Sequence, residues 1–474
     1  MLPYKLENGR RVGAWGYEFE WTPDHLTAEQ LRSMIFSYDE LATKCLDRFD
    51  DLPLTSKTKP RRQERSNDTA PEMGHPDLYD ILRSRAPEDE TLQRLWHQVT
   101  TVPVWVDWAQ LERGQKVFYR YAGPSIVGLT FQSLLGGMGS PRVVETLNRT
   151  GGFGVKIVRR RLLETFQHVL DVTRSLRSIQ PGGQGFASSI RVRLLHASVR
   201  RRILALVRSQ PDYYSLAEHG VPINDLNSIA TITAFSATLI WISFPRQGIR
   251  LGAGEVADYL ALWRYVAHLL GTPTHPFSSP RLARATMESP LLSELSPSPT
   301  SRALANNMIA ALASQPPTYA SAGFLRAEAH WLNGRQLADA LGVPRPRWYH
   351  TVLVAGQCLF FAAVCYARRS VPAWDEAGIK RARVLLERVT LEQTGGEVAM
   401  HGFKYVPGCR EGTQCDPAGD GEGERGKEGG WREGGVEARN LKVVIVASVV
   451  VGWVVWLGFK GVSELLLQVA GSIS

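Results

Sequence analysis

Two stretches with apolar residues three and four positions apart constrain the fold more than any other feature of this sequence. They cover residues 155–177 and 188–208, and a turn rich in glycine, 181–185, joins them. Apolar side chains at this spacing share one face of an α-helix, so both stretches are predicted to be helices that pack through those faces. We therefore expect a helical hairpin at the centre of the molecule.

Three polar side chains interrupt these apolar faces. Arg161 and Thr165 lie one turn apart on the first predicted helix, and His196 lies on the second. Burying an arginine without a counter-charge is costly, because the charge loses its hydration. Arg161 is therefore expected to have an anionic partner, which can be Glu145, Glu164 or a ligand group such as a phosphate or a haem propionate.

His196 can have several roles on such a face. It can be a metal or haem ligand, a general base, or a hydrogen-bonded residue of the core. Arg193 and Arg200 lie about one turn before and after it. Three arginines near a neutral imidazole suit a non-covalent haem with two propionates, but arginines at helix edges also extend to water. The spacing alone leaves these alternatives open.

The rest of the chain predicts an all-α fold. Most apolar segments recur at helical spacing and few alternate as strands do, although 223–244 fits a strand or a buried helix. The apolar run 349–367 is long enough to span a bilayer, but His350, Gln357 and two cysteines favour a buried core helix.

Composition excludes several classes of protein. The five cysteines are widely spaced, without zinc-site spacing or Cys-x-x-Cys-His, and are predicted to be free thiols in a reducing compartment. The net charge of +9 comes from scattered arginines without an aromatic-interleaved basic stripe, so nucleic acid is not an expected partner. The sequence also lacks His-Glu-x-x-His, Gly-x-Ser-x-Gly and Walker motifs.

The C-terminal region differs in composition from the rest. A Gly/Glu-rich stretch precedes the run 443–459, in which every residue is apolar, Gly or Ser. That run is long enough to cross a thin bilayer, and the excess of Lys and Arg before it favours a cytosolic main domain. The predicted parts are an N-terminal extension and polar loop (1–85), the main domain (86–410), a linker (411–440), a transmembrane helix (441–460) and a short tail (461–474).

Several short motifs occur in order along the chain. The central pair is Arg161-Leu162-Leu163-Glu164-Thr165 and Val192-Arg193-Leu194-Leu195-His196-Ala197-Ser198-Val199-Arg200. In these motifs the chain resembles the rubber oxygenase (latex clearing protein) family and its fungal relatives, the ER-bound oxygenases of the mycophenolic acid pathway type. Further motifs that carry the resemblance are Trp105-Val106-Asp107-Trp108, Arg113-Gly114, Ser133-Leu134-Leu135-Gly136-Gly137, Thr150-Gly151-Gly152-Phe153, Gly220-Val221-Pro222-Ile223-Asn224, Leu262-Trp263-Arg264-Tyr265 and Tyr405-Val406-Pro407.

The resemblance implies a globin-reminiscent helical domain with a non-covalent haem b. It implies that His196 binds the iron, that Arg161 and Thr165 support the haem in its pocket, and that dioxygen is the co-substrate in the cleavage of polyisoprenoid double bonds. Glu145 stands where the rubber-cleaving members carry a glutamate that acts as a base at the allylic position. Such a base suits an apolar pocket, because desolvation raises the basicity of a carboxylate.

One departure limits the expected substrate. Glu164 stands where the rubber-cleaving enzymes carry a lysine, which favours the fungal-type branch. We therefore expect a lipophilic prenyl or polyisoprenoid-like alkene drawn from the membrane of the endoplasmic reticulum rather than long-chain rubber. The alternative is a non-catalytic, membrane-tethered haem-binding or sensor protein. A hydrolase with His196 as its base lacks a positioned nucleophile.

Overall fold

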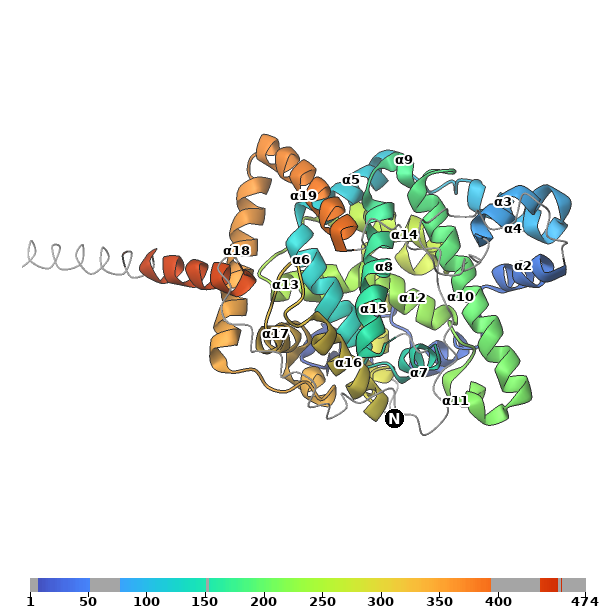
Figure 1. Cartoon of the computed structure of the whole chain (residues 1–474), viewed down its shortest axis with the longest axis horizontal. Helices are drawn as coiled ribbons and strands as arrows, with labels where there is room; N and C mark the ends of the chain where they lie inside the picture. The colour runs from blue at the N-terminus through green and yellow to red at the C-terminus, as the bar shows by residue number, and fades with distance from the viewer. Residues whose placement is uncertain (1–6, 52–76, 151–152, 394–434, 451–452, 454–474) are drawn as a thin grey trace, which may run out of the picture.

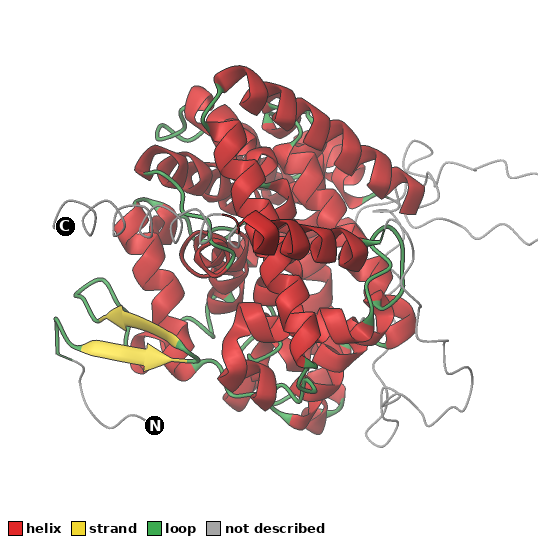
Figure 2. Cartoon of the chain, turned by 90° about the vertical axis from the view of Figure 1, so that its left-hand side faces the viewer, coloured by secondary structure: helices red, strands yellow, loops and turns green. Residues whose placement is uncertain are grey.

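The computed structural model describes residues 7–51, 77–150, 153–393, 435–450 and 453. Helices dominate these residues, which confirms the mostly helical fold (Figures 1 and 2). The principal helices are α1 (Ala28–Ser33), α2 (Glu40–Asp51), α3 (Leu78–Arg85), α4 (Glu90–Thr100), α5 (Trp108–Arg120), α6 (Ala122–Val127), α7 (Pro141–Arg149), α8 (Val155–Thr173), α9 (Leu176–Ile179), α10 (Gln184–Ser209), α11 (Leu216–His219), α12 (Asp225–Phe235), α13 (Phe244–Arg246), α14 (Ala253–Leu269), α15 (Pro280–Ser293), α16 (Pro299–Leu312), α17 (Ala322–Ala340), α18 (Trp348–Arg369) and α19 (Pro372–Gln393).

A β-hairpin near the N-terminus is the exception to the all-α prediction. Strands β1 (Arg11–Ala14) and β2 (Tyr17–Glu20) pair antiparallel, and the turn residues Trp15 and Gly16 have positive φ angles of 54° and 74° (Figure 2). Two positive φ angles in a two-residue turn match the right-handed twist of a hairpin. The hairpin is anchored on α15, where the Tyr17 hydroxyl donates to Glu288 Oε1 at 2.8 Å.

The region expected to be an N-terminal extension is packed into the body where it is described. Thr27 caps α1 in a capping box with Gln30, and α1 ends at Ser33 before a separate helix, α2, begins. Cys45 and Leu46 of α2 are buried in the larger hydrophobic core together with residues of α3 and α4. Residues 52–76, expected to be an exposed loop, lie outside the described residues.

The central helical hairpin forms as predicted from α8 and α10, with α9 in the turn. The two helices run antiparallel, because His168 contacts Ser188 while Asp171, further along α8, contacts Gly185, nearer the start of α10. A Cβ atom on Gly185 would lie 2.4 Å from the carbonyl oxygen of Asp171. Glycine is therefore required for this backbone-to-backbone approach.

Glycine is also required for a close approach of two helices in the motif Arg113-Gly114. A Cβ atom on Gly114 would lie 2.3 Å from the carbonyl oxygen of Asp258, so glycine lets α5 and α14 pack closely. Arg113 then binds the Asp258 carboxylate with two hydrogen bonds, of 2.9 and 3.0 Å. This pair of helices forms part of the larger core.

The stretch 223–244, which fitted either a strand or a buried helix, is helical. It contains α12 and the π-helical segment η5 (Leu239–Ser243), and the break between them bends the path by 42°. A second π-helical segment, η3 (Gly128–Leu135), continues α6. Both segments lie in the interior, where π-type turns redirect side chains without ending a helix.

A smaller hydrophobic core forms around α16, α17 and α18. Within the described residues, α18 is the one continuous helix long and apolar enough to cross a membrane, with a mean hydropathy of 1.6. Its buried face includes Leu353, Val354 and Cys358, in line with the predicted core helix. The other face is exposed.

The helix 436–450 begins inside the predicted linker (411–440) and crosses α18 near Gly356. The linker prediction is therefore wrong for residues 436–440, where Asn440 is fully buried against α18. In Figure 1 the helix projects from the body beside α18, drawn in red. The predicted transmembrane helix, 441–460, falls within the described residues only at 441–450 and 453. The motif Tyr405-Val406-Pro407 and the tail lie outside them.

Candidate functional site

A large internal cavity of about 1150 Å³ lies between the two hydrophobic cores. Its wall is formed by η3, α7, α8, α10, α12, α17 and α19, and most of the lining side chains are apolar. Ligand pockets in proteins span roughly 300 to 1,000 Å³, so this volume exceeds that of a site for one small molecule. It is large enough for a flat cofactor and a second, lipophilic molecule.

His196 lies in the wall of this cavity, on α10. Burial, helped by the nearby Arg200 charge, lowers the pKa of its imidazole to about 4. The ring is therefore neutral at physiological pH. No hydrogen bond joins the ring to another of the residues that the structure describes. A neutral imidazole with an available nitrogen lone pair is the form that binds a metal.

Arg161, Glu164 and Thr165 face the same cavity from α8. Arg161 Nη1 lies 3.6 Å from Glu164 Oε2, so Glu164 is the anionic partner that the sequence left open. Burial lowers the pKa of the Arg161 guanidinium despite this carboxylate. A desolvated cation on a cavity wall gains from a further anion, such as a carboxylate of a bound molecule.

Arg193 is held by protein groups outside the cavity wall. Its side chain is almost fully buried, and it binds the Asp39 carboxylate with hydrogen bonds of 2.6 and 2.9 Å and Gln98 Oε1 at 2.9 Å. These contacts join α10 to the N-terminal region. These contacts therefore explain the burial of the Arg193 side chain without the cofactor role that was predicted for it.

Arg200 has a comparable position two turns further along α10. Its guanidinium donates to the backbone carbonyl oxygens of Pro222 and Ile223 and to Thr43 Oγ1, and it stacks over the ring of Tyr38 at 4.9 Å. It is absent from the cavity wall. Its contacts secure the Gly220-Val221-Pro222-Ile223-Asn224 motif.

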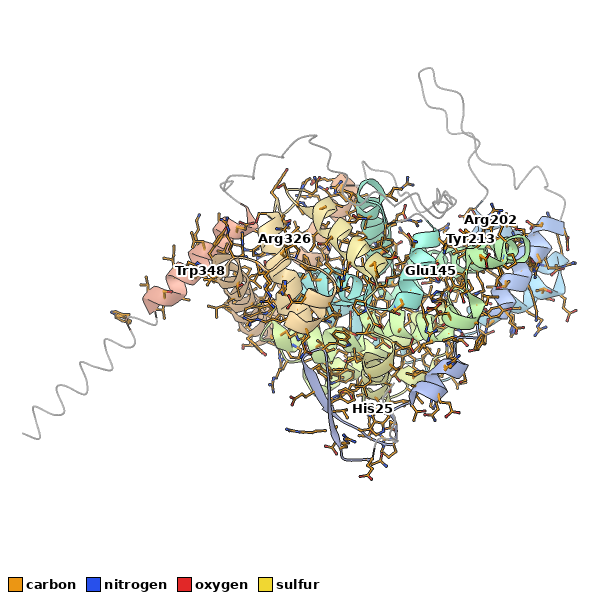
Figure 3. All side chains as sticks on the ribbon, turned by 90° about the horizontal axis from the view of Figure 1, so that it is seen from below. His25, Glu145, Arg202, Tyr213, Arg326 and Trp348 are labelled. Carbon is orange, nitrogen blue, oxygen red and sulfur yellow. The ribbon has the colours of Figure 1, made fainter. Side chains whose placement is uncertain are left out.

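Glu145 lies on α7, which contributes Thr146 and Leu147 to the cavity wall, but Glu145 itself does not line the cavity. Its carboxylate accepts a hydrogen bond of 2.7 Å from Arg149, and Arg149 in turn stacks on Tyr213. Glu145 and Tyr213 are labelled near each other in Figure 3. The carboxylate is thus committed to an ion pair next to the cavity. A role as base requires it to leave Arg149.

His168 is a second imidazole of the cavity, which the sequence did not single out. It is buried on α8, two turns after Arg161, and its Nδ1 lies 2.9 Å from Ser188 Oγ. Ser188 also donates to the carboxylate of Asp171, so Nδ1 carries the proton in the bond to Ser188. Nε2 is then unprotonated, and it has no hydrogen-bond partner in the part of the chain that the structure describes. Burial and the neighbouring His196 lower the His168 pKa to about 4.

The spacing could have revealed His168. It follows Arg161 and Thr165 by seven and three positions, which places it on the same face of the helix. It was obscured because a single histidine in an apolar pattern is most often a core residue. The turn between α8 and α10 brings Ser188 opposite His168, and the hydrogen bond between them fixes the orientation of the His168 ring.

A buried carboxyl group at the other end of the cavity was also missed. Glu328 of α17 lines the cavity, is hydrogen-bonded to Gln357 of α18, and lies near Arg439 of helix 436–450. Burial raises its pKa to about 8, so it is mostly protonated at neutral pH. Arg439 also approaches Gln357 Oε1 at 3.5 Å and stacks over Phe360 at 4.8 Å. No sequence signal connects these residues, because Glu328 and Gln357 lie 29 positions apart and Gln357 and Arg439 lie 82 positions apart.

The fold and the cavity together define a helical protein that encloses a large apolar ligand site with two neutral imidazoles. The profile of the family described as ER-bound oxygenase mpaB/B'/Rubber oxygenase, catalytic domain, matches residues 119–365. The chain belongs to this family, which confirms the resemblance seen in the motifs. It is therefore a member of an oxygenase family.

Two known proteins support this assignment. A rubber oxygenase from Streptomyces sp. (strain K30) is 24% identical over 187 residues, which cover 38% of this chain and 42% of the relative. The match thus spans less than half of that relative. The solved structure of Latex Clearing Protein LCP in the closed state matches with a TM-score of 0.53 and 18% identity, over 74% of this chain and 91% of that one. At this identity the structural match establishes the fold alone.

Proposed function

We propose that this protein is a haem b-dependent oxygenase that oxygenates or cleaves a double bond in a lipophilic, prenyl or polyisoprenoid-like substrate. The observation that carries the proposal is His196: a neutral imidazole, without a protein hydrogen bond in the described chain, on the wall of an apolar cavity of about 1150 Å³. Family membership supplies the oxygenase chemistry.

The residues of the cavity fit a haem. His196 would bind the iron, and Arg161 would bind a propionate, since a desolvated guanidinium favours a carboxylate partner. Thr165 lies one turn from Arg161 on the same wall and would contact the cofactor. Arg193 and Arg200 would act indirectly, because their contacts with Asp39 and with Pro222 and Ile223 set the position of α10.

The haem iron, when bound, supplies the activation of dioxygen. The protein residues orient the substrate and exclude water. The stacked rings of Phe235 and Trp263, 4.9 Å apart, form an apolar surface in the wall against which an isoprenoid chain can pack. An apolar wall of this kind also keeps bulk water from a reactive centre.

Glu145 remains our candidate for the base that removes an allylic proton. Its carboxylate is next to the cavity, and a shift of α7 that breaks the ion pair with Arg149 would bring an unsolvated carboxylate toward the substrate. A Glu145→Gln variant should then retain haem but lose turnover. Unchanged turnover would reject this role.

We further propose that the apolar run 441–460 anchors the protein in the membrane of the endoplasmic reticulum, with the main domain in the cytosol. The described part of the run, 441–450, is a helix whose apolar side chains are largely exposed, including Ile445, Val446 and Val449. Exposed apolar side chains on several sides of a helix are stable in lipid and unfavourable in water. The anchor would keep the cavity close to substrates dissolved in the membrane.

The proposal is tested by reconstituting the full chain in detergent or nanodiscs with haem and supplying ¹⁸O₂ with prenylated alkenes. Mass spectrometry should find labelled carbonyl or hydroxyl products. Haem binding with dioxygen binding, but without label in any lipophilic alkene, would instead favour a haem sensor. Absence of haem binding would contradict both.

A further inference from the structure

The exposed face of α18 is an uncharged apolar stripe. Trp348, Val352, Leu359 and Tyr366 are spaced four, seven and seven residues apart, so they lie on one side of the helix. All four are exposed, Trp348 by 78% and Leu359 by 47%. Between Trp348 and Ala367 the helix contains no Asp, Glu, Lys or Arg, so the stripe runs for about 27 Å without a charge.

The ends of the stripe have the composition of a membrane interface. Trp348 and Tyr366 are the terminal members, and aromatic residues of this kind are enriched at the level of the lipid headgroups. Arg347 precedes the stripe, and Arg368 and Arg369 follow it. Basic side chains at both ends complement anionic headgroups.

Helix 436–450 leaves the body at this same helix. It crosses α18 at Gly356, where an added Cβ atom would lie 2.8 Å from the carbonyl oxygen of Asn440. The crossing is fixed by polar contacts: Asn440 Nδ2 donates to Gln357 Oε1 at 3.3 Å, and Glu437 Oε1 accepts from the backbone N–H of Ser321 at 2.7 Å.

Beyond the crossing the helix projects away from the body. Figure 1 shows it at a steep angle to α18, and Figure 3 places Trp348 at the same end of the molecule. If the projecting helix enters a bilayer, α18 therefore lies along the surface of that bilayer.

We propose that α18 is an in-plane membrane-docking helix, whose apolar stripe is immersed at the headgroup level of an anionic bilayer. An exposed uncharged stripe of this length is unfavourable in water and indicates an interaction surface. The bilayer is the occupant because the exposed apolar helix 436–450 departs from the same face. Docking through two nearly perpendicular helices would hold the body in one orientation, which a single flexible anchor cannot do.

This orientation places one end of the cavity against the membrane. The inner side of α18 contributes Gln357 and Phe361 to the cavity wall, and the root of helix 436–450 contributes Val436 and Arg439. Leu385 of α19 lines the cavity and is also 58% exposed, which makes it the candidate point of entry. A lipophilic substrate can then pass sideways from the bilayer into the cavity. This entry route rests on the proposed function, whereas the docking of α18 does not.

The docking is tested with a fluorescent probe at position 359 of the full chain. Cys409 and Cys415 are replaced by Ser, and Leu359→Cys is labelled with an environment-sensitive dye. The native Cys45, Cys358 and Cys365 are buried, and burial raises the pKa values of their thiols, so they should resist labelling. The matched control is Val104→Cys, a fully exposed apolar position in the loop before α5.

In vesicles of phosphatidylcholine and phosphatidylserine, the probe at 359 should shift to shorter wavelength. Lipids with a quencher near the headgroup should quench it at least ~5-fold more than the probe at 104. Water-like emission at 359 would overturn the proposal. A blue shift without quenching by lipid would also overturn it, because protein, from a second copy or from residues 394–434, would then cover the stripe.

A second measurement separates docking from catalysis. Leu359→Glu should raise the KM for a membrane-dissolved substrate several-fold and leave kcat and the haem spectrum unchanged. The haem spectrum of the labelled samples is recorded in parallel. A bound haem without quenching at 359 would contradict the docking alone, and quenching without haem would contradict the proposed function alone.

Discussion

Replacing Gly185 by alanine should separate α8 from α10 and destabilise the protein. The new Cβ atom would lie 2.4 Å from the carbonyl oxygen of Asp171 and 3.0 Å from Val172 Cα. Ordinary contacts are about 3.5 to 4 Å, so the backbones must move apart by about 1 Å. Overpacking of this kind costs about 1 to 3 kcal/mol, against which alanine offers at most ~1 kcal/mol of helix propensity. With the full propensity gain subtracted, the net loss is up to about 2 kcal/mol.

Gly254→Ala is the matched control for this substitution. Gly254 is also the second residue of its helix, α14, and an added Cβ atom would have no neighbour within 4 Å. It should leave stability unchanged or raise it by up to ~1 kcal/mol. Urea unfolding of the detergent-solubilised chain measures both midpoints. Equal midpoints for the two variants would refute the close approach of α8 and α10.

Three further predictions concern the charged and titratable groups. Arg193→Ala should destabilise the chain by about 3 to 5 kcal/mol, because it leaves the buried Asp39 carboxylate without its partner. The fraction of the variant that remains folded should still bind haem. Loss of haem binding at unchanged stability would contradict the structural role of Arg193. Glu328, whose pKa is raised to about 8, binds its proton more tightly in the folded state, so the stability of the protein should fall as pH rises from 4.5 to 8. Glu328→Gln should remove this pH dependence. Urea unfolding midpoints at both pH values measure the difference. His168, with its pKa lowered to about 4, stays neutral in the folded state while the unfolded chain binds a proton below pH 6.5, so stability should fall between pH 6.5 and 4. In the haem-free chain His168→Gln should reduce the slope of that part of the profile, and His196, whose pKa is also lowered to about 4, accounts for a remaining slope. An unaltered profile would contradict the burial of the His168 ring.

Local patterns in the sequence predicted most of the helices. The spacing of apolar residues located α8 and α10. The β-hairpin was missed because its strands have four residues each, too few for alternation to be distinguished.

The candidate site was only partly predictable. Arg161, Thr165 and His196 do line one cavity, because the antiparallel packing of α8 on α10 brings the two apolar faces together. Arg193 and Arg200 differ because their partners, Asp39 and the carbonyl oxygens of Pro222 and Ile223, come from distant parts of the chain. Helical spacing gives the direction of a side chain but not its partner. The same limit applies to Glu145, whose pairing with Arg149 leaves it beside the cavity.

A haem titration of three proteins tests most directly whether His196 binds the iron. The wild-type chain should bind one haem and develop a Soret band. His168→Ala, which alters the second imidazole of the same cavity, should retain the band, whereas His196→Ala should lose it and regain it on addition of free imidazole, which can occupy the space of the lost ring. A Soret band in His196→Ala indistinguishable from that of the wild type would contradict the central claim that this residue binds the iron.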